Sequence, residues 1–299
     1  MKGFSMRSAI CLAKMVCLAC IVVLAAGCSV VKLTYNNADT LTLLWLNRYV
    51  DLDAGQEAWT KDRVREFHVW HRVTQLPDYA QMLVRTRTLL QSPVTRADML
   101  ALNAEIAARL DVATIKALPD LATLALQLSP EQIAYMERKF EKNNTEFRKD
   151  FLDIDTEQRQ ENRYKTVLWL AEFWFGRFSA EQEAAIKRAS YARPLINELW
   201  LSERLARQRD LIVVLKRIQA EKPSPHATLA LLKDQAVRAT GIANIPNAAT
   251  RAEAEAAAAH AAQLAAAIVN LTTPEQRQRA MDKLQQWADD FVALSLEGR

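Results

Sequence analysis

The chain has 299 residues, of which 39 are Lys or Arg, 35 are Asp or Glu and only six are Gly. Residues 1–27 hold three of the basic residues and none of the acidic ones, so the remainder carries 36 basic against 35 acidic residues. Because this remainder is nearly neutral, its charge gives no argument for nucleic acid as a partner or for a polybasic membrane-binding surface.

The first 27 residues have the layout of a lipoprotein signal peptide. Lys2, Arg7 and Lys14 form a basic start, an uncharged apolar run follows, and small residues precede Cys28. The apolar run is shorter than the roughly 20 residues that span a bilayer as a helix. Leu24–Ser29 resembles the lipobox, at which bacteria cleave the signal and attach lipid to the cysteine. The alternative is an ordinary secretion signal in which Cys28 has no role.

The positions of the cysteines favour lipidation. All four of them lie in the first 28 residues, so the mature chain keeps only Cys28 and forms no internal disulfide. Attachment of several acyl chains to that thiol would hold the protein stably on a membrane. Ser29, rather than Asp, follows the cysteine. By resemblance to bacterial lipoproteins, this implies the outer membrane of a Gram-negative cell, with the body facing the periplasm.

Composition indicates the fold class. Half of the residues are apolar and glycine is rare, while Ala, Leu, Glu, Arg and Gln are abundant, which favours helix over strand. The sequence has no period-2 alternation and no Asn-Gly or Asp-Gly hairpin signal. We therefore predict an all-α fold, a multi-helix bundle of antiparallel helical hairpins with about 9–12 helices.

We predict five segments along the chain. Residues 1–27 form the signal peptide, and residues 28–35 form a lipidated tether that keeps the body close to the membrane. Residues 36–221 form the main helical domain. Residues 222–249 contain three prolines and a glycine, and are expected to be a connector or hinge with one short helix. Residues 250–299 form a C-terminal helical pair that packs on the main domain.

A short motif marks many of the predicted helix starts, with Ser, Thr or Asp three residues before Gln. Such a pair forms a capping box: the short side chain accepts from the third helical N–H, and the Gln reaches back to the N–H of the cap residue. The caps and their glutamines are Asp53 and Gln56, Ser129 and Gln132, Asp155 and Gln158, Ser179 and Gln182, and Thr273 and Gln276. Thr250 and Glu253 are predicted to form a sixth box.

The segment around Leu41, Leu44 and Trp45 is apolar on nearly every side. Asn36 or Asn37 is expected to cap this helix at its start. A helix that is apolar all round either lies inside a bundle or contacts a membrane interface. We favour burial, because the segment has little of the cationic face that interfacial helices use.

A second apolar segment ends at Phe175. Tyr164, Ala171 and Phe175 share one helical stripe, which Trp169 and its neighbours widen. We expect this to be the most buried helix of the protein. Gly176 is expected to end it in a tight turn, after which an antiparallel neighbour begins.

Several blocks of the sequence together resemble a known family. The blocks are Tyr35–Thr40, Trp45–Leu52, His68–Arg72 and the turn from Phe173 to Gln182. They are similar to the domain-of-unknown-function 6279 family of bacterial lipoproteins, and the likeness extends over the whole chain after the signal. The resemblance implies a membrane location and an all-helical body. It implies no activity and no functional residues.

A weaker likeness is to the small periplasmic chaperones of the Spy and CpxP type, which carry paired Leu-Thr-x-x-Gln motifs. Leu128-Ser129-x-x-Gln132 and Phe178-Ser179-x-x-Gln182 are the nearest matches. A capping box alone produces this spacing. The chain is also longer than those chaperones and lacks the net positive charge of a cationic cradle.

His68 and His71 lie one helical turn apart and are the only candidates for a metal site. A metal ion needs three or four ligands, and the two remaining histidines are remote in sequence. We therefore expect no metal and no cofactor. The simpler interpretation is that both histidines bond backbone or carboxylate groups beside Trp59 and Trp70.

Arg204 and Arg207 are candidate interaction residues in a basic run on one predicted helix. They could contact lipopolysaccharide phosphates or peptidoglycan carboxylates. We favour a solvated face in which the basic residues pair with Glu203 and Asp210, because exposed pairs are common and carry little information.

The sequence contains no catalytic signature. It has no Gly-rich phosphate loop and no Gly-x-Ser-x-Gly elbow, although carboxylates from distant helices could still assemble a site. We therefore expect a non-enzymatic, outer-membrane-anchored lipoprotein that acts by binding in envelope assembly, maintenance or stress response. The alternatives are an ATP-independent client-binding chaperone and, third, a peptidoglycan-active enzyme.

Overall fold

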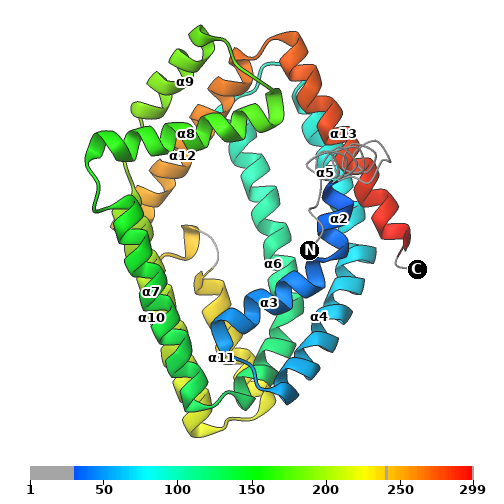
Figure 1. The fold of residues 1–299 in the computed structure, drawn as a ribbon, viewed down its shortest axis with the longest axis vertical. Helices are drawn as coiled ribbons and strands as arrows, with labels where there is room; N and C mark the ends of the chain where they lie inside the picture. The colour runs from blue at the N-terminus through cyan, green and yellow to red at the C-terminus, as the bar shows by residue number, and fades with distance from the viewer. Residues whose placement is uncertain (1–29, 240–241, 298–299) are drawn as a thin grey trace, which may run out of the picture.

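The computed structural model describes residues 30–239 and 242–297, and these residues form an all-α protein (Figure 1). Twelve α-helices and one short 3-10 helix account for the secondary structure of this part, which contains no strand. The predicted fold class and helix number are therefore confirmed. Cys28 and the predicted signal peptide lie outside the described residues.

Helix lengths range from two turns to nine. The helices are α2 (Val30–Asn36), α3 (Ala38–Val50), α4 (Ala54–Thr74), α5 (Leu76–Leu89), α6 (Arg96–Gln127), α7 (Pro130–Phe151), α8 (Thr156–Phe175), α9 (Ala180–Tyr191), α10 (Asn197–Glu221), α11 (Pro225–Ala239), η1 (Ile242–Asn244), α12 (Ala248–Leu271) and α13 (Pro274–Glu297). Within the described ranges, no helix is both long enough and apolar enough to cross a membrane.

The helices form an elongated frame around α6. In Figure 1, α7 and α10 lie side by side on the left, α8 and α9 cross the top, and α4, α5 and α13 form the right side. Helix α6 runs down the middle, where it packs on α12 at one end and on α11 at the other. The predicted C-terminal pair therefore makes separate contacts: α12 packs on α6 and α9, and α13 packs on α5.

Two apolar cores stabilise the frame. The upper core joins α5, α8, α9, α12 and α13, and includes Ile186 and Ala280. The lower core joins α3, α6, α7, α10 and α11, and includes Ile133 and Ile218. Helix α6 contributes Leu118 to the lower core, while its first turn packs on the upper core. Helix α11 is the one short helix expected within residues 222–249, and it packs in the lower core.

Capping boxes start several helices, as their spacing predicts. Asp53, Ser129 and Ser179 accept from the N–H of the glutamine three residues later, and each glutamine side chain accepts from the N–H of its cap. Thr273 and Gln276 make the same two bonds. Asp155 caps α8 from its side chain alone, so the predicted box forms only in part, and the side-chain amide of Gln158 donates to Asn162.

The glutamines of two capping boxes also bond each other across the bundle. Nε2 of Gln56 donates to Oε1 of Gln132 (3.2 Å), and Nε2 of Gln132 donates to Oε1 of Gln56 (2.6 Å). Each amide also donates to a backbone carbonyl just ahead of the partner's helix. Gln56 donates to Gln127, which precedes α7 (3.1 Å), and Gln132 donates to Asp51, which precedes α4 (2.9 Å). All four hydrogen-bonding positions of each amide are therefore used, and the N-termini of α4 and α7 are joined.

The same arrangement recurs at the start of α9 and α13. Gln182 and Gln276 exchange reciprocal amide hydrogen bonds of 2.9 and 3.2 Å. Gln182 donates to the carbonyl of Leu271, and Gln276 donates to that of Arg177. We call Gln56–Gln132 and Gln182–Gln276 the glutamine pairs. In each pair, one local motif caps its own helix and fixes a tertiary contact.

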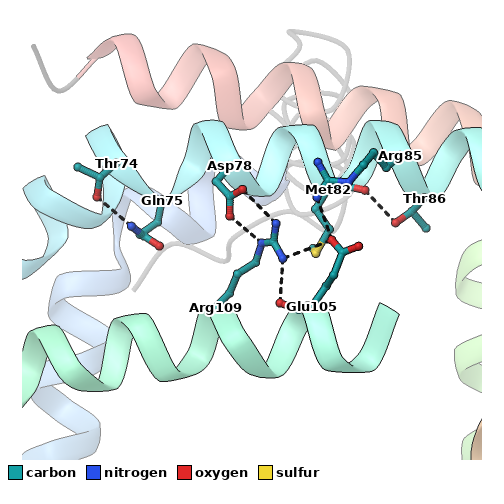
Figure 2. A network of polar contacts seen from close by, with 8 residues as sticks. All are labelled: Thr74, Gln75, Asp78, Met82, Arg85, Thr86, Glu105 and Arg109. Atoms are coloured by element: carbon teal, nitrogen blue, oxygen red, sulfur yellow. Dashed lines mark hydrogen bonds and ion pairs between the residues drawn. The ribbon is translucent and has the colours of Figure 1, made fainter. Parts of the chain in front are cut away.

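A guanidinium clamp holds α6 on α5 (Figure 2). Nε of Arg109 lies 2.8 Å from one carboxylate oxygen of Asp78, and Nη2 donates to the other at 3.0 Å. Nη1 of Arg109 donates to the backbone oxygen of Glu105, whose carboxylate accepts from Arg85. Arg109 is mostly buried, whereas its partners are partly exposed. The clamp therefore joins α5, from Asp78 in its first turn to Arg85, to the first half of α6.

Two burial predictions were wrong. In α3, Leu41, Leu44 and Trp45 are each more than half exposed, and only the opposite side contacts the lower core. Helix α8 buries Tyr164 and its stripe as expected but leaves Trp169 66% exposed, so it is not the most buried helix. Apolar content alone does not specify how many neighbours a helix has.

Two predicted boundaries also differ from the structure. Residues 30–36 form α2, although a tether was expected to continue to residue 35. The expected cap at Thr250 was wrong: α12 begins earlier, and its cap is Asn247, whose side chain accepts from the N–H of Thr250. Asn37 precedes α3 but makes no side-chain cap, because its amide donates to Leu33.

Candidate functional site

A largely apolar cavity of about 590 Å³ lies among α3, α6, α7, α10 and α11. Its volume falls in the range of about 300–1,000 Å³ that is usual for small-molecule sites. Most of its wall consists of aliphatic and aromatic side chains: Trp45, Leu46, Tyr49, Val50, Leu118, Leu121, Leu124, Ala125, Leu128, Met136, Phe140, Leu211, Leu215, Leu232 and Ala236. The remaining wall residues are Thr114, Arg204, Arg207, Gln208 and Gln235.

The helical period explains how the cavity is lined. On α6, Leu118, Leu121 and Ala125 recur every three or four residues and so share a face. On α10, Leu211 and Leu215 do the same, directly beyond Arg204 and Arg207. The wall therefore changes along α10 from charged to apolar.

The structure places both candidate arginines, Arg204 and Arg207, in the wall of this cavity. Among the residues that the structure describes, neither guanidinium forms an ion pair. The expected pairing with Glu203 and Asp210 was wrong for these two arginines, since Asp210 instead lies 3.9 Å from Arg209. The cavity wall thus contains two cations and no carboxylate.

Gln235 adds an unused hydrogen-bond acceptor to the wall. Its side chain is only 5% exposed, and its Nε2 donates to the backbone oxygen of Arg207 (3.3 Å). No donor from the described part of the chain reaches its Oε1. A buried acceptor without a partner is costly, so this oxygen is an unsatisfied polar group beside the cavity and not an exposed contact for a ligand.

Two other hollows lie on α10 and differ in chemistry. A hollow of about 710 Å³ between α7 and α10 is lined by side chains of both signs, among them Glu137 and Arg148. Another, of about 470 Å³, lies between α10 and α12 and has Arg207 in its wall as well. Of these three hollows, which described residues line, the cavity described above alone combines a long apolar wall with one sign of charge, and it is therefore the best candidate site.

His68 and His71 hold α2 in place. The ring of Tyr35 stacks on both histidines, with centroids 4.6 and 5.9 Å away, and its hydroxyl lies 2.8 Å from Nδ1 of His71. Burial raises the pKa of Tyr35 to about 12. The hydroxyl is therefore protonated at pH 7, and the tautomer of His71 sets the direction of its hydrogen bond with Nδ1. The partner is a phenol, whereas backbone or carboxylate partners were expected.

The electrostatics of this cluster keep both histidines neutral at pH 7. Burial, and secondarily His68, lowers the pKa of His71 to about 4, and burial also lowers the pKa of His68. Within residues 30–239 and 242–297, no group of three or more His, Cys, Asp or Glu side chains could hold a metal ion. The arrangement therefore fixes one helix on another by stacking and hydrogen bonding.

Sequence reasoning identified the two arginines but not the cavity. The wall of the cavity comes from five helices, and no local sequence pattern indicates which apolar helix faces line a cavity and which pack against each other. The only local signal is polar: Gln208 and Gln235 interrupt apolar faces of α10 and α11. The anchor site, Cys28, cannot be placed because it lies outside the described residues.

Comparison with known proteins gives one match. The model of a family of unknown function, DUF6279, matches residues 48–237. This range runs from the end of α3 into α11 and includes every cavity residue except Trp45 and Leu46. No curated protein and no solved structure matches the chain.

Proposed function

Since the chain belongs to DUF6279, a family of unknown function, we propose its role from its own structure: a lipid-anchored binding protein. It would be attached to the bacterial outer membrane through acylated Cys28 and would face the periplasm. The lipobox at residues 24–29 and the absence of other cysteines after residue 27 support the anchor. Ser29 supports the outer rather than the inner membrane.

The observation that carries the binding role is the single-sign apolar cavity. Its long aliphatic wall suits an acyl chain, and Arg204 and Arg207 suit a carboxylate or phosphate. We therefore propose that the ligand is an amphiphile with an acyl chain and an anionic head group, such as envelope membranes supply. The wall has no carboxylate, histidine or thiol, which supports binding rather than catalysis.

Displacement of a fluorescent fatty acid from the soluble fragment 29–299 tests this proposal. The fragment contains every helix of the structure. We expect Arg207→Gln to weaken binding of palmitate about tenfold or more, as loss of one charged hydrogen bond implies. Binding of the uncharged alcohol of the same length should be unchanged.

Arg209→Gln is the matched control, because Arg209 lies on the same helix and is largely exposed. It should leave both affinities unchanged. Equal weakening by the two variants, or equal weakening for acid and alcohol, would contradict a specific head-group contact. Absence of any binding would remove the proposal.

A client-binding chaperone is the second candidate, and exposed apolar side chains favour it. Leu110 and Ile115 on α6, and Trp169 on α8, are each more than half exposed. Such surfaces often bind other proteins. Fragment 29–299 should then suppress aggregation of an unfolded client, and Leu110→Ser with Ile115→Ser should reduce that effect. Unimpaired aggregation in the presence of the native fragment would exclude this role.

A further inference from the structure

The first two helices expose an unusual amount of apolar surface. Val30, Leu33, Leu41, Leu44 and Trp45 are between 52% and 70% exposed, although all are large and apolar. They are the first such residues that the structure describes, and they lie within 16 consecutive positions. We call these five residues the α2–α3 patch.

The patch follows the helical period. On α3, Leu41, Leu44 and Trp45 are three and four residues apart, so they share one face. The opposite side of α3 packs against the lower core through Leu43 and Leu46. Helix α3 therefore has two apolar faces, and only one of them is covered by the protein.

Helix α2 is fixed to the body of the protein, so it does not cover the exposed face of α3. Tyr35 stacks on His68 and bonds His71, as described above. In addition, Arg72 donates to Asn36 (2.8 Å), and Lys32 lies 3.7 Å from Asp290. The contacts of α2 come from both α4 and α13, which leaves Val30 and Leu33 on the outside.

The patch lies close in the chain to the proposed lipid anchor, and this indicates that a membrane covers it. Only Ser29 separates Cys28 from the first residue of α2. Because one residue spans at most about 3.6 Å, the lipidated cysteine lies within roughly 7 Å of Val30. We propose that the α2–α3 patch lies in the lipid leaflet that holds the anchor, at the boundary between head groups and acyl chains. This inference depends on the proposed anchor.

The charge of the region fits this placement. Arg48 is exposed one turn beyond Leu44, at the edge of the patch, where it can reach lipid phosphates. Lys32 is already paired with Asp290, so little net charge assists binding. The patch therefore orients a protein that the acyl chains hold, and by itself it binds membranes only weakly.

The placement also connects the membrane with the cavity. Trp45 belongs to the patch and lines the cavity wall. If the patch lies in the leaflet, this edge of the cavity meets the acyl chains directly. An amphiphile could then pass between leaflet and cavity without crossing water, which would suit the ligand class proposed above.

A site-specific fluorescent label tests the proposal. Fragment 29–299 has no cysteine, so Leu44→Cys can carry a single environment-sensitive NBD dye. The control is Val213→Cys on α10, which is 60% exposed and lines the hollow between α7 and α10. On addition of vesicles of phosphatidylethanolamine and phosphatidylglycerol, we expect dye emission to rise at least about twofold and shift to the blue for Leu44→Cys only.

The possible results test the placement of the patch in the membrane separately from the lipidation of Cys28. No change at Leu44→Cys at saturating vesicle concentration, or an equal change at Val213→Cys, would overturn it. A blue shift without vesicles that grows with protein concentration would also overturn it, because a second copy would then cover the patch. Leu41→Ser with Leu44→Ser should reduce vesicle partitioning about tenfold. Labelling of the full chain with a clickable fatty acid tests the anchor independently.

Discussion

Replacing one glutamine of a glutamine pair tests whether a capping motif also stabilises tertiary structure. We consider Gln132→Ala at the start of α7. The substitution removes the bonds of this amide to Ser129 (3.0 Å), Asp51 (2.9 Å) and Gln56. It also leaves the amide of Gln56, which is a buried side chain, without its partner. The change therefore affects the N-termini of two helices.

The expected cost follows from these contacts. Loss of half of a capping box costs about 1 kcal/mol. Loss of the hydrogen bonds to Gln56 and Asp51, including the unpaired amide that remains at Gln56, costs about 2 kcal/mol more. We therefore expect the free energy of unfolding to fall by about 3 kcal/mol, or the melting temperature by roughly 6 °C for a chain of this size.

Urea unfolding of fragment 29–299, followed by circular dichroism, measures this effect. The matched control is Gln158→Ala, because Gln158 occupies the same position behind Asp155 but donates only to exposed Asn162. The free energy of unfolding of this control variant should fall by less than about 0.5 kcal/mol. If the two substitutions have equal effects, the pairing of Gln132 contributes nothing. Combining Gln132→Ala with Gln56→Ala should cost less than the sum of both.

Three further predictions concern other contacts. Arg109→Ala should lower the free energy of unfolding by about 1 kcal/mol, because the mostly buried guanidinium loses its bonds to Asp78 and to the backbone of Glu105, whereas exposed Arg85→Ala should cost under about 0.5 kcal/mol in the same urea assay. Folding holds the pKa of His71 near 4, below its ordinary 6.5, so stability should decline as pH falls from 6.5 towards 4, and His71→Gln should flatten that decline. Gly176→Ala should lower the melting temperature by a few degrees, because the residue has φ of +81° and its new Cβ would meet Arg279. An unchanged melting curve would contradict this last expectation.

The sequence predicts helix starts well where the signal is local. Asp53 and Ser129 are each followed by a glutamine at the required spacing, and each forms a capping box. Thr250 was misidentified because Asn247 stands three residues earlier and can also cap, and the turn after Pro246 selects the earlier start. When two capping residues are within one turn, spacing alone does not decide between them.

Tertiary contacts could not be predicted in the same way. Nothing local shows that the amide of Gln56 meets that of Gln132, which is 76 residues away in the chain. For the same reason, the apolar content of α3 did not reveal that Trp45 remains exposed beside the cavity. The candidate arginines were found from a basic run in the sequence, but whether they meet acidic partners depends on how α10 is rotated in the bundle.

Helix α6 has a consequence for how the molecule melts. Its first half packs on α12 and is clamped to α5, while its second half supplies Leu118 to the lower core. One continuous helix therefore serves as a shared wall for two otherwise distinct apolar interiors. Thermal unfolding of either interior would also unfold α6, on which the other interior depends. We therefore expect both to unfold in a single cooperative step.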